Sequence, residues 1–502
     1  MRMNALLSAL LSIGLLGSAL TANAQTSSGY ATKTLYQPQQ ARHTYEAPPK
    51  GFQAIYTELL ARHGARGLTS LSDDAALYNL WRQAQTERAL TPLGQTLGPA
   101  IEELMQANIR IGYGNLTALG KQEHQALAQR LWQRLQPMFE HALSQQQPRP
   151  ILWVSSGVGR AVDSKDNFIA SLAKQDARLP KIIQATAKVP DASGTEVGIN
   201  RYQLYFHALK PSDAQVAPQS ASALTYELSR QHQTFLKHNS VLQQAMAQAE
   251  QNSARQKAAR SSLRKLFHTD FITRLEQGHY QISDAGTFHG TDANGQAVTL
   301  TGTGKTTINN AVEAMNSLYA LYAIAPAFET SLRNDWRRFI SPATANQWAE
   351  LADTEDFYEK GPSFIDQLHQ NQLMARELLN DFFSEIDGLS QTDTAHLAKL
   401  RFSHAEIVIP FAYTLGLTQN GDAMPVGTPY RYSNNAWRGE RISPFAANIQ
   451  WDVFRNEQGQ LLVKMLYNER ETLFKPTCDF ARVNGTRYFY DYQGLKQCYR
   501  AE

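Results

Sequence analysis

Three stretches of the chain share one pattern, in which a short apolar run ends at a polar turn and a helical pattern follows. Residues 52–60 form the first run, which stops at the turn 61–64, and residues 151–154 and 397–402 form the other two. Runs of this length and composition predict buried strands. Because ligands of open parallel α/β sheets bind at the carboxyl ends of the strands, we expect the three turns to meet at one edge of one sheet.

The middle of the chain follows a different pattern. From about residue 200 to 385, long stretches show helical periodicity. Leu228, Phe235 and Leu242 recur at heptad spacing, and residues 312–322 place apolar side chains on one face of a helix. The sequence therefore predicts an α/β fold that is interrupted by a mostly α-helical region.

These patterns divide the chain into an α/β part, residues 51–175 and 386–502, and an α-helical insertion, residues 176–385. Residues 25–50 are rich in Ser, Thr, Gln and Pro and lack periodicity, which predicts an extended lead-in. A chain of 502 residues, 42% hydrophobic and 19% charged, is typical of a folded protein with two or three structural units.

The first 24 residues have the features of an export signal. Arg2 supplies the positive start, residues 5–20 form an apolar stretch, and Ala22-Asn23-Ala24 matches the pattern that signal peptidase cleaves. A buried N-terminal helix is the alternative, and the apolar stretch is too short and too interrupted for a membrane span. We therefore expect a periplasmic or secreted protein that starts near Gln25 and has no membrane segment after cleavage.

Export also bears on the two cysteines, Cys478 and Cys498. In an oxidising compartment, an even pair this close most simply forms one disulfide. Closing a loop of about 20 residues would stabilise the C-terminal segment by roughly 3 kcal/mol on the chain-entropy account. Two free buried thiols are the alternative.

The net charge does not favour nucleic acid as a partner. The chain carries 48 basic and 45 acidic residues, for a formal charge of +3. This balance gives no reason to expect a nucleic acid partner. Any ligand must therefore be recognised by local groups of residues.

The turn after the first predicted strand, Arg62-His63-Gly64-Ala65-Arg66, has the chemistry to hold and attack a phosphoryl group. The planar guanidinium groups of Arg62 and Arg66 match phosphate oxygens bidentately, and Gly64 permits close approach of the backbone. The same positive charges lower the pKa of His63, which keeps a ring nitrogen unprotonated and nucleophilic. An exposed basic turn is the alternative, which the position at a strand end disfavours.

The other two junctions supply groups that would complete such a site. Arg160 follows the second strand; alone it would be interpreted as a surface residue, but beside the first motif it is a candidate third phosphate ligand. His404 follows the third strand and can donate to a phosphate oxygen. Two positions later, Glu406 can protonate the departing alcohol oxygen as a general acid.

Taken together, Arg62-His63-Gly64-Ala65-Arg66, Arg160 and His404-Ala405-Glu406 resemble the signatures of the histidine phosphatase superfamily, in its acid phosphatase and phytase branch. The His-Ala-Glu sequence, in place of His-Asp, is similar to the multiple inositol polyphosphate phosphatase group. Secondary features that agree are Leu116-Thr117-x-x-Gly120, Phe357-Tyr358-Glu359-Lys360-Gly361 and Leu466-Tyr467-Asn468-Glu469 before Cys478. One departure is Leu68, where the family usually has proline, and it concerns the shape of the loop and the subfamily.

The resemblance implies a phosphoglycerate-mutase-like α/β domain whose helical insertion forms the other wall of the substrate cleft. It also implies that His63 attacks the phosphate to give a phosphohistidine while Glu406 protonates the leaving oxygen, and that water then releases the phosphate. In the family, the transition state is stabilised by the residues corresponding to Arg62, Arg66, Arg160 and His404. No metal or other cofactor is expected, and the sequence contains no HExxH, zinc-spaced Cys/His pairs or EF-hand loop.

The expected function is hydrolysis of a small anionic phosphate ester, an inositol polyphosphate such as phytate. A broad-specificity acid phosphatase or sugar phosphatase with the same chemistry is the first alternative. A phosphate-ester-binding protein without turnover is less favoured, because binding alone requires the arginines but neither His63 nor Glu406. A mutase, which passes the phosphoryl group to another hydroxyl, is disfavoured by export.

Overall fold

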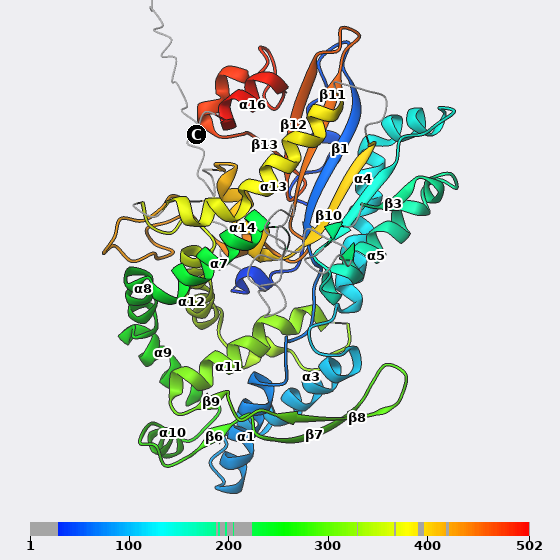
Figure 1. Cartoon of the computed structure of the whole chain (residues 1–502). Coiled ribbons are helices and arrows are strands. Elements are labelled where there is room, and N and C mark those ends of the chain that lie inside the picture. The colour runs from blue at the N-terminus through cyan, green and yellow to red at the C-terminus, as the bar shows by residue number, and fades with distance from the viewer. Residues whose placement is uncertain are drawn as a thin grey trace, which may run out of the picture.

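The structure is a computed structural model (Figure 1), and it describes residues 29–186, 189–190, 196–197, 204, 223–328, 330–365, 368–389, 396–417 and 421–500. The predicted export signal, residues 1–24, lies outside these ranges. Within them, no helix combines the length and the apolar character needed to cross a bilayer.

The centre of the molecule is a mixed eight-stranded sheet in the order β13-β12-β11-β1-β10-β2-β3, with β14 paired to β12. Its strands are β1 (Gln53–Arg62), β2 (Ile151–Ser155), β3 (Ile183–Ala185), β10 (Ala398–Ser403), β11 (Asn448–Arg455), β12 (Leu461–Tyr467), β13 (Arg470–Thr472) and β14 (Tyr490–Asp491). β1, β10, β2 and β3 pair in parallel, whereas β11, β12 and β13 pair antiparallel with their neighbours. The predicted α/β class is confirmed, and an antiparallel half extends the predicted parallel strands.

Helices cover both faces of this sheet (Figure 1). They are α4 (Ala118–Leu143) and α5 (Gly159–Ala173) on one face, and α13 (Leu368–Leu389) and α14 (Ala405–Thr414) on the other. Side chains of β1 alternate between them: Leu59 and Ala61 pack in the cluster under α4 and α5, and Tyr56 and Leu60 pack in the cluster under α13 and α14. Burial on both faces agrees with the many apolar residues of β1 and β10. The buried charges among them are paired, as Arg401 of β10 is with Glu58 of β1 at 3.0 Å.

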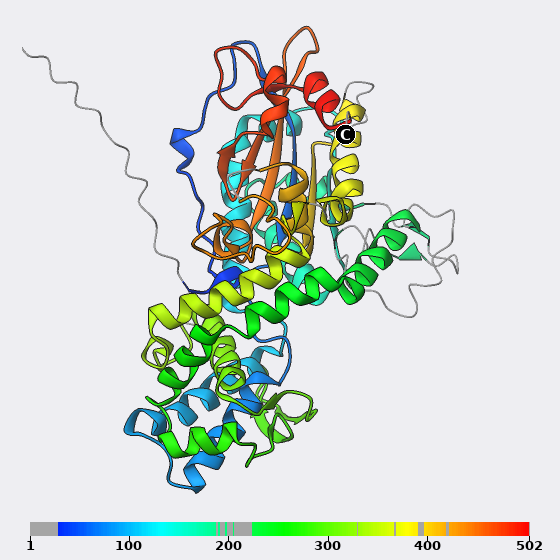
Figure 2. The same cartoon turned by 90° about the vertical axis from the view of Figure 1, so that its left-hand side faces the viewer.

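A second lobe, below the sheet in Figures 1 and 2, is built around its own hydrophobic cluster. It comprises α1 (Asp73–Thr86), α2 (Pro92–Gln95), α3 (Leu97–Ile111), α9 (Ser253–Leu263), α10 (Thr269–Glu276), α11 (Ala311–Ile324), α12 (Pro342–Glu359), β6 (Ile282–Ser283), β7 (Gly286–Thr291), β8 (Ala297–Gly302) and β9 (Thr307–Ile308). α7 (Ala223–His238) packs on α13, and α8 (Ser240–Glu250) packs on α12. The lobe therefore combines helices of the predicted insertion with α1 and α3, which precede it in the chain.

The segment before β1 and the C-terminal segment both pack against the sheet domain. Residues 29–50 contain the 3-10 helices η1 (Ala31–Lys33) and η2 (Arg42–Thr44) and run along one side of that domain (Figure 2). At the other end of the chain, the predicted Cys478–Cys498 disulfide is present and joins η9 (Pro476–Ala481) to α16 (Tyr492–Arg500). Short elements elsewhere are η3 (Leu179–Lys181), β4 (Val189–Pro190), β5 (Glu196–Val197), η5 (Ala325–Phe328), η6 (Trp336–Arg338) and α15 (Gly439–Ile442).

Candidate active site

The three predicted junctions meet at one edge of the sheet. In the parallel register Arg62, the last residue of β1, lies opposite Ser403 of β10, and β2 pairs with β10 up to its own last residue, Ser155. The His63 N–H donates to the Ser403 carbonyl at 2.9 Å. The structure therefore places Arg62, His63 and His404 at adjacent strand ends.

The His63 ring is held in one tautomer. Its Nδ1 lies 2.9 Å from the Gly64 carbonyl oxygen, which can only accept, so Nδ1 carries the proton and Nε2 keeps its lone pair. Burial holds the pKa of His63 well below its usual value, and the positive charge of Arg62 adds to this effect. The imidazole is therefore neutral and nucleophilic at Nε2 over the whole neutral pH range.

Arg62 is buried and fixed by backbone carbonyls. Its Nη1 donates to the carbonyl of Thr32 at 2.5 Å and to that of Ser443, and its guanidinium lies 4.9 Å from the centre of the Phe445 ring. Burial lowers its pKa to about 10, so the group stays charged at neutral pH. Among the residues that the structure describes, the buried Nε of Arg62 has no hydrogen-bond partner, which suits it to an anion that enters the site.

Arg66 and Arg160 reach the same site from different elements. Arg66 donates from Nη1 to the carbonyl of Gly67 at 2.7 Å, and Arg160 lies in the first turn of α5. The charges of both arginines contribute to the lowered pKa of His63. The structure thus gathers the three predicted arginines around the histidine.

His404 and Glu406 belong to the start of α14. His404 is the residue before the helix; its Nε2 lies 2.7 Å from Ser156 Oγ, and its ring centre lies 5.4 Å from that of His63. Glu406 stands in the first turn of α14, and its charge acts on both Arg62 and Lys360. Both predicted residues of the third junction therefore face the group formed by the first.

Two glycines, Gly64 and Gly120, allow close contact between α4 and the loop that follows β1, residues 63–67, which is the catalytic loop. A β-carbon on Gly64 would lie 2.3 Å from the Gly120 carbonyl oxygen, and one on Gly120 would lie 2.0 Å from the Ala65 carbonyl oxygen. Thr117 donates to the same Ala65 oxygen from Oγ1 at 3.3 Å and caps α4 by accepting from the Gly120 N–H. The Leu116-Thr117-x-x-Gly120 motif thus forms the surface on which the catalytic loop rests.

Buried polar residues that sequence reasoning missed hold this loop from behind. The Glu123 carboxylate accepts from the Ala65 N–H at 2.7 Å and from the Tyr36 N–H at 3.1 Å. Burial raises the pKa of Glu123 to about 7, although these hydrogen bonds oppose the shift. The next residue, His124, donates from Nε2 to the Arg62 carbonyl at 3.0 Å. The segment before β1 is therefore tied to the catalytic loop through α4.

Three further charged residues near the site come from η1 and from the end of α12. Lys360 pairs with Asp356 at 2.6 Å; burial opposes its charge, but the carboxylates of Asp356 and Glu406 raise its pKa above the usual value. Thr32 donates from Oγ1 to Asp356 at 3.4 Å. Lys33 follows Thr32, and the same two carboxylates act on its charge. Lys360 belongs to the Phe357-Tyr358-Glu359-Lys360-Gly361 motif described above, whereas no sequence motif indicated a role for Lys33.

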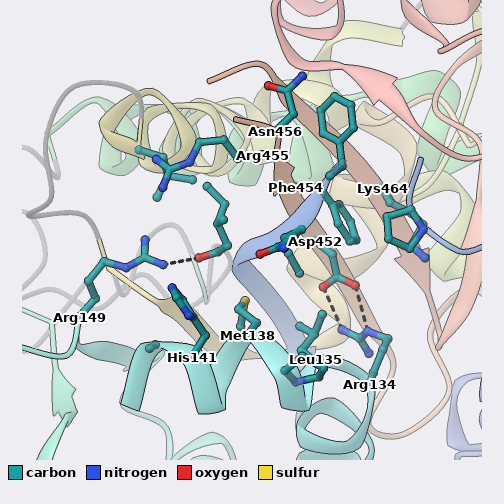
Figure 3. Close-up of a pocket in the computed structure, with 18 of the residues that line it drawn as sticks. Arg134, Leu135, Met138, His141, Arg149, Asp452, Phe454, Arg455, Asn456 and Lys464 are labelled. Atoms are coloured by element: carbon teal, nitrogen blue, oxygen red, sulfur yellow. Dashed lines mark hydrogen bonds and ion pairs between the residues drawn. The ribbon is translucent and has the colours of Figure 1, made fainter. Parts of the chain in front are cut away.

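A cavity of about 1420 Å³ opens at the opposite end of the same strands (Figure 3). The first residues of β1, the last residues of β11 and part of α4 line it. Two of its arginines already have protein partners: Arg134 pairs with Asp452 at 2.9 Å, and Arg149 donates to the Ile55 carbonyl at 2.5 Å. The predicted chemical groups all lie at the other edge of the sheet. Over the described ranges, no group of three or more His, Cys, Asp or Glu side chains is arranged to hold a metal ion.

A neutral, oriented histidine among arginines, with a glutamate at an adjacent helix start, defines a site that can bind a phosphoryl group and accept it on nitrogen. The family model described as "Histidine phosphatase superfamily (branch 2)" matches residues 50–468. The chain therefore belongs to the histidine phosphatase superfamily, a family of phosphoric monoester hydrolases, and the resemblance seen in its motifs is confirmed.

Solved structures and one curated sequence are similar to the chain. The multiple inositol polyphosphate phosphatase of Bifidobacterium longum in complex with inositol hexasulfate has a TM-score of 0.81 and 30% identity, over 94% of this chain and 97% of that one. Its complex with phosphate has a TM-score of 0.83 and 29% identity over the same shares. Multiple inositol polyphosphate phosphatase 1 of Gallus gallus is 23% identical over 162 residues, which span 30% of this chain and only 35% of the chicken protein. The phytase of D. castellii, with a TM-score of 0.59 and 11% identity over 97% of this chain and 90% of its own, shares the fold.

Proposed function

We propose that this protein hydrolyses phosphomonoesters of inositol polyphosphates, phytate among them, through a phosphohistidine intermediate on His63. The observation that carries the proposal is the state of this histidine: a buried, neutral ring whose Nδ1 is satisfied by Gly64 and whose Nε2 remains available among arginines. The similarity to a protein that binds inositol hexasulfate supports the choice of an inositol ring bearing several anions.

In the first step, the Nε2 lone pair of His63 forms a bond to phosphorus while the ester P–O bond breaks. Protonated Glu406 gives its proton to the departing oxygen, which leaves a free hydroxyl, a phosphohistidine and a carboxylate. In the second step, water attacks phosphorus, Glu406 takes the proton of that water, and the P–N bond breaks. The products are inorganic phosphate and neutral His63.

The cations of the site act on the oxygens of the phosphoryl group during both steps. The positions of Arg62 and Arg66 are fixed before substrate arrives, since backbone carbonyls, including that of Gly67, hold both guanidinium groups. Preorganised donors of this kind stabilise developing charge without reorganising during the reaction. The proposed phosphoryl ligands are Arg62, Arg66, Arg160 and His404.

The helical insertion is proposed to form the wall that faces the sheet edge and selects the alcohol part of the substrate. In the proposed domain organisation, residues 51–175 and 386–502 supply the chemistry and residues 176–385 supply that wall. The signal-like segment, residues 1–24, supports export to the periplasm or the medium.

Phosphate release from phytate by residues 25–502 tests the proposal, beside p-nitrophenyl phosphate and glucose phosphates at mildly acidic pH. His63→Ala is the blank. We expect phytate turnover that depends on His63, with lower inositol phosphates as products. Turnover of the simple esters alone would move the protein to the broad-specificity acid phosphatases. Binding of phytate without turnover would show that the protein only binds phosphate esters.

A further inference from the structure

Lys33 comes from the segment before β1. It nevertheless lies at the catalytic edge, the edge of the sheet that carries Arg62, His63 and His404. The residues on either side of it are fixed: the Thr32 carbonyl accepts from Arg62 Nη1 at 2.5 Å, and the Thr34 carbonyl accepts from the Phe445 N–H at 2.9 Å. η1, which ends at Lys33, packs against α11, α12 and α15. The backbone of Lys33 is therefore anchored to a phosphate-binding arginine on one side and to the loop before β11 on the other.

Four charged groups at this edge influence the charge of the Lys33 ammonium. Arg66 and Arg62 act against its charge, and Asp356 and Glu406 favour it. The side chain is partly buried. Among the residues that the structure describes, no acceptor takes a hydrogen bond from its ammonium and no carboxylate forms an ion pair with it.

Lys360, another lysine near this edge, differs from Lys33 because it has a carboxylate partner. Its ammonium lies 2.6 Å from Asp356, so its charge is neutralised within the protein. The other Asp356 oxygen accepts from Thr32. Within the described part of the chain, Lys33 therefore has no such carboxylate partner. A partly buried cation beside two arginines is unfavourable unless an anion compensates it.

We propose that Lys33 binds the phosphoryl group that is transferred, as a further cation beside Arg62 and Arg66; this inference rests on the proposed function. The flanking arginines belong to the motif that carries the nucleophile, and Glu406 is the proposed proton donor to the ester oxygen. Because these three groups influence the charge of Lys33, we place its ammonium at the subsite of the transferred phosphate rather than at a distant phosphate of the ring. A Lys ammonium suits this place because it is a compact point charge with three donors.

The environment of Lys33 makes its contribution depend on pH. Burial, with Arg66 and Arg62, lowers its pKa to about 7, so in the free protein the group loses its charge above that pH. A bound anion favours the ammonium, so binding above about pH 7 requires uptake of a proton and becomes weaker as pH rises. The charged or titratable residues on the elements around η1 are Arg62, Arg66, Glu123, Tyr319, Tyr322, Asp353, Glu355, Asp356, Glu359, Lys360, Glu406, Glu440 and Arg441. Substitutions at Lys33 separate its contribution to the pH dependence of anion binding from the contributions of these residues.

Inositol hexasulfate is the probe for this test, because sulfate esters stay ionised across the pH range and are not substrates. Its dissociation constant is measured by calorimetry at about pH 5.5 and about pH 8.5, on either side of the Lys33 transition. In the wild type we expect the affinity to fall by roughly tenfold from the lower to the higher pH. A change of this size corresponds to the loss of one hydrogen bond to a charged group. Lys33→Met should bind about tenfold more weakly at the lower pH and lose most of the pH dependence. Lys33→Arg, which stays charged, should bind with similar affinity at both values.

Steady-state kinetics show which phosphate of the substrate Lys33 contacts. Lys33→Met should raise KM more than it lowers kcat, for p-nitrophenyl phosphate as well as for phytate, because both present the transferred phosphate. A defect confined to phytate would overturn the proposal, since it would place Lys33 on another phosphate of the ring. Lys50→Met is the control: this lysine lies in the same segment, is exposed, and precedes β1 at the opposite edge.

The outcome for Lys33 is separable from that for the proposed function. If the wild type is active and Lys33→Met leaves KM, the affinity for inositol hexasulfate and its pH dependence unchanged, the Lys33 proposal is overturned. The proposed function would not be affected by that result. A wild type without phosphatase activity would overturn the proposed function first. If Lys33→Met does not fold, Lys33→Arg decides, because affinity as pH-sensitive as that of the wild type would contradict the proposal.

Discussion

Gly120, in the first turn of α4, tests how the catalytic loop is positioned. A β-carbon at this residue would lie 2.0 Å from the Ala65 carbonyl oxygen and 2.7 Å from the Ala65 nitrogen. Non-bonded heavy atoms pack at about 3.5 Å, so Gly120→Ala must push the loop and the helix apart by roughly 1 Å or more. Ala65 is two residues from His63 and next to Arg66, so the displacement reaches both the nucleophile and a phosphate ligand.

The magnitude follows from this displacement. A misplacement of about 1 Å costs on the order of 100-fold in rate, and overpacking costs about 1–3 kcal/mol in stability. We therefore expect Gly120→Ala to lower kcat on p-nitrophenyl phosphate by about 100-fold and the free energy of unfolding in urea by about 1–3 kcal/mol.

Gly388→Ala is the matched control, since an added β-carbon in that turn of α13 meets nothing within 4 Å. It should leave kcat unchanged and stabilise the protein slightly, by at most about 1 kcal/mol. If Gly120→Ala kept the kcat of the wild type, the argument that this contact positions the loop would be refuted.

Three further predictions concern the proton donor, the disulfide and a buried carboxyl group. Glu406→Gln should lower kcat/KM for phytate far more than for p-nitrophenyl phosphate, whose leaving group needs little protonation; equal losses would contradict the acid role. Replacing Cys478 and Cys498 by serine should lower the free energy of unfolding in urea by roughly 3 kcal/mol with little loss of activity, and an unchanged midpoint would contradict it. Burial raises the pKa of Asp353, which accepts from Tyr432, to about 8. Its stabilising effect is therefore complete below about pH 4 and lost as pH rises through about 8, so the stability of the wild type relative to Asp353→Asn should fall over that interval; a constant difference would contradict it.

The strand ends were predictable from sequence because their chemistry is local. In each of the three junctions the apolar run and the functional residues are contiguous, so Arg62, His63 and His404 could be placed at one edge before any packing was known. The parallel direction of β1, β10 and β2 followed from the strand–turn–helix pattern of the three junctions. The antiparallel direction of β11 and β12 could not be predicted, because the pattern of apolar and polar residues within a strand does not indicate the direction of its neighbour.

Residues that depend on packing between distant segments could not be predicted. The charge of Glu406 acts on Lys33 only because η1 folds back onto the catalytic edge, and the Glu123 carboxylate joins Tyr36 to Ala65 across the start of α4. The second lobe illustrates the same limit, since α1 and α3 share a hydrophobic cluster with α11. Periodicity identifies such helices and their apolar faces, but it does not say which faces meet.

The central claim is that His63 carries the phosphoryl group between the two steps. The most direct test quenches the protein in alkali within the first turnover of p-nitrophenyl phosphate and maps its phosphopeptides by mass spectrometry. We expect an acid-labile phosphoryl group on the ring of His63, absent from His63→Ala, that is formed and lost at rates that match turnover. Turnover at the wild-type rate by His63→Ala, or a burst of p-nitrophenol without phosphate on His63, would contradict it.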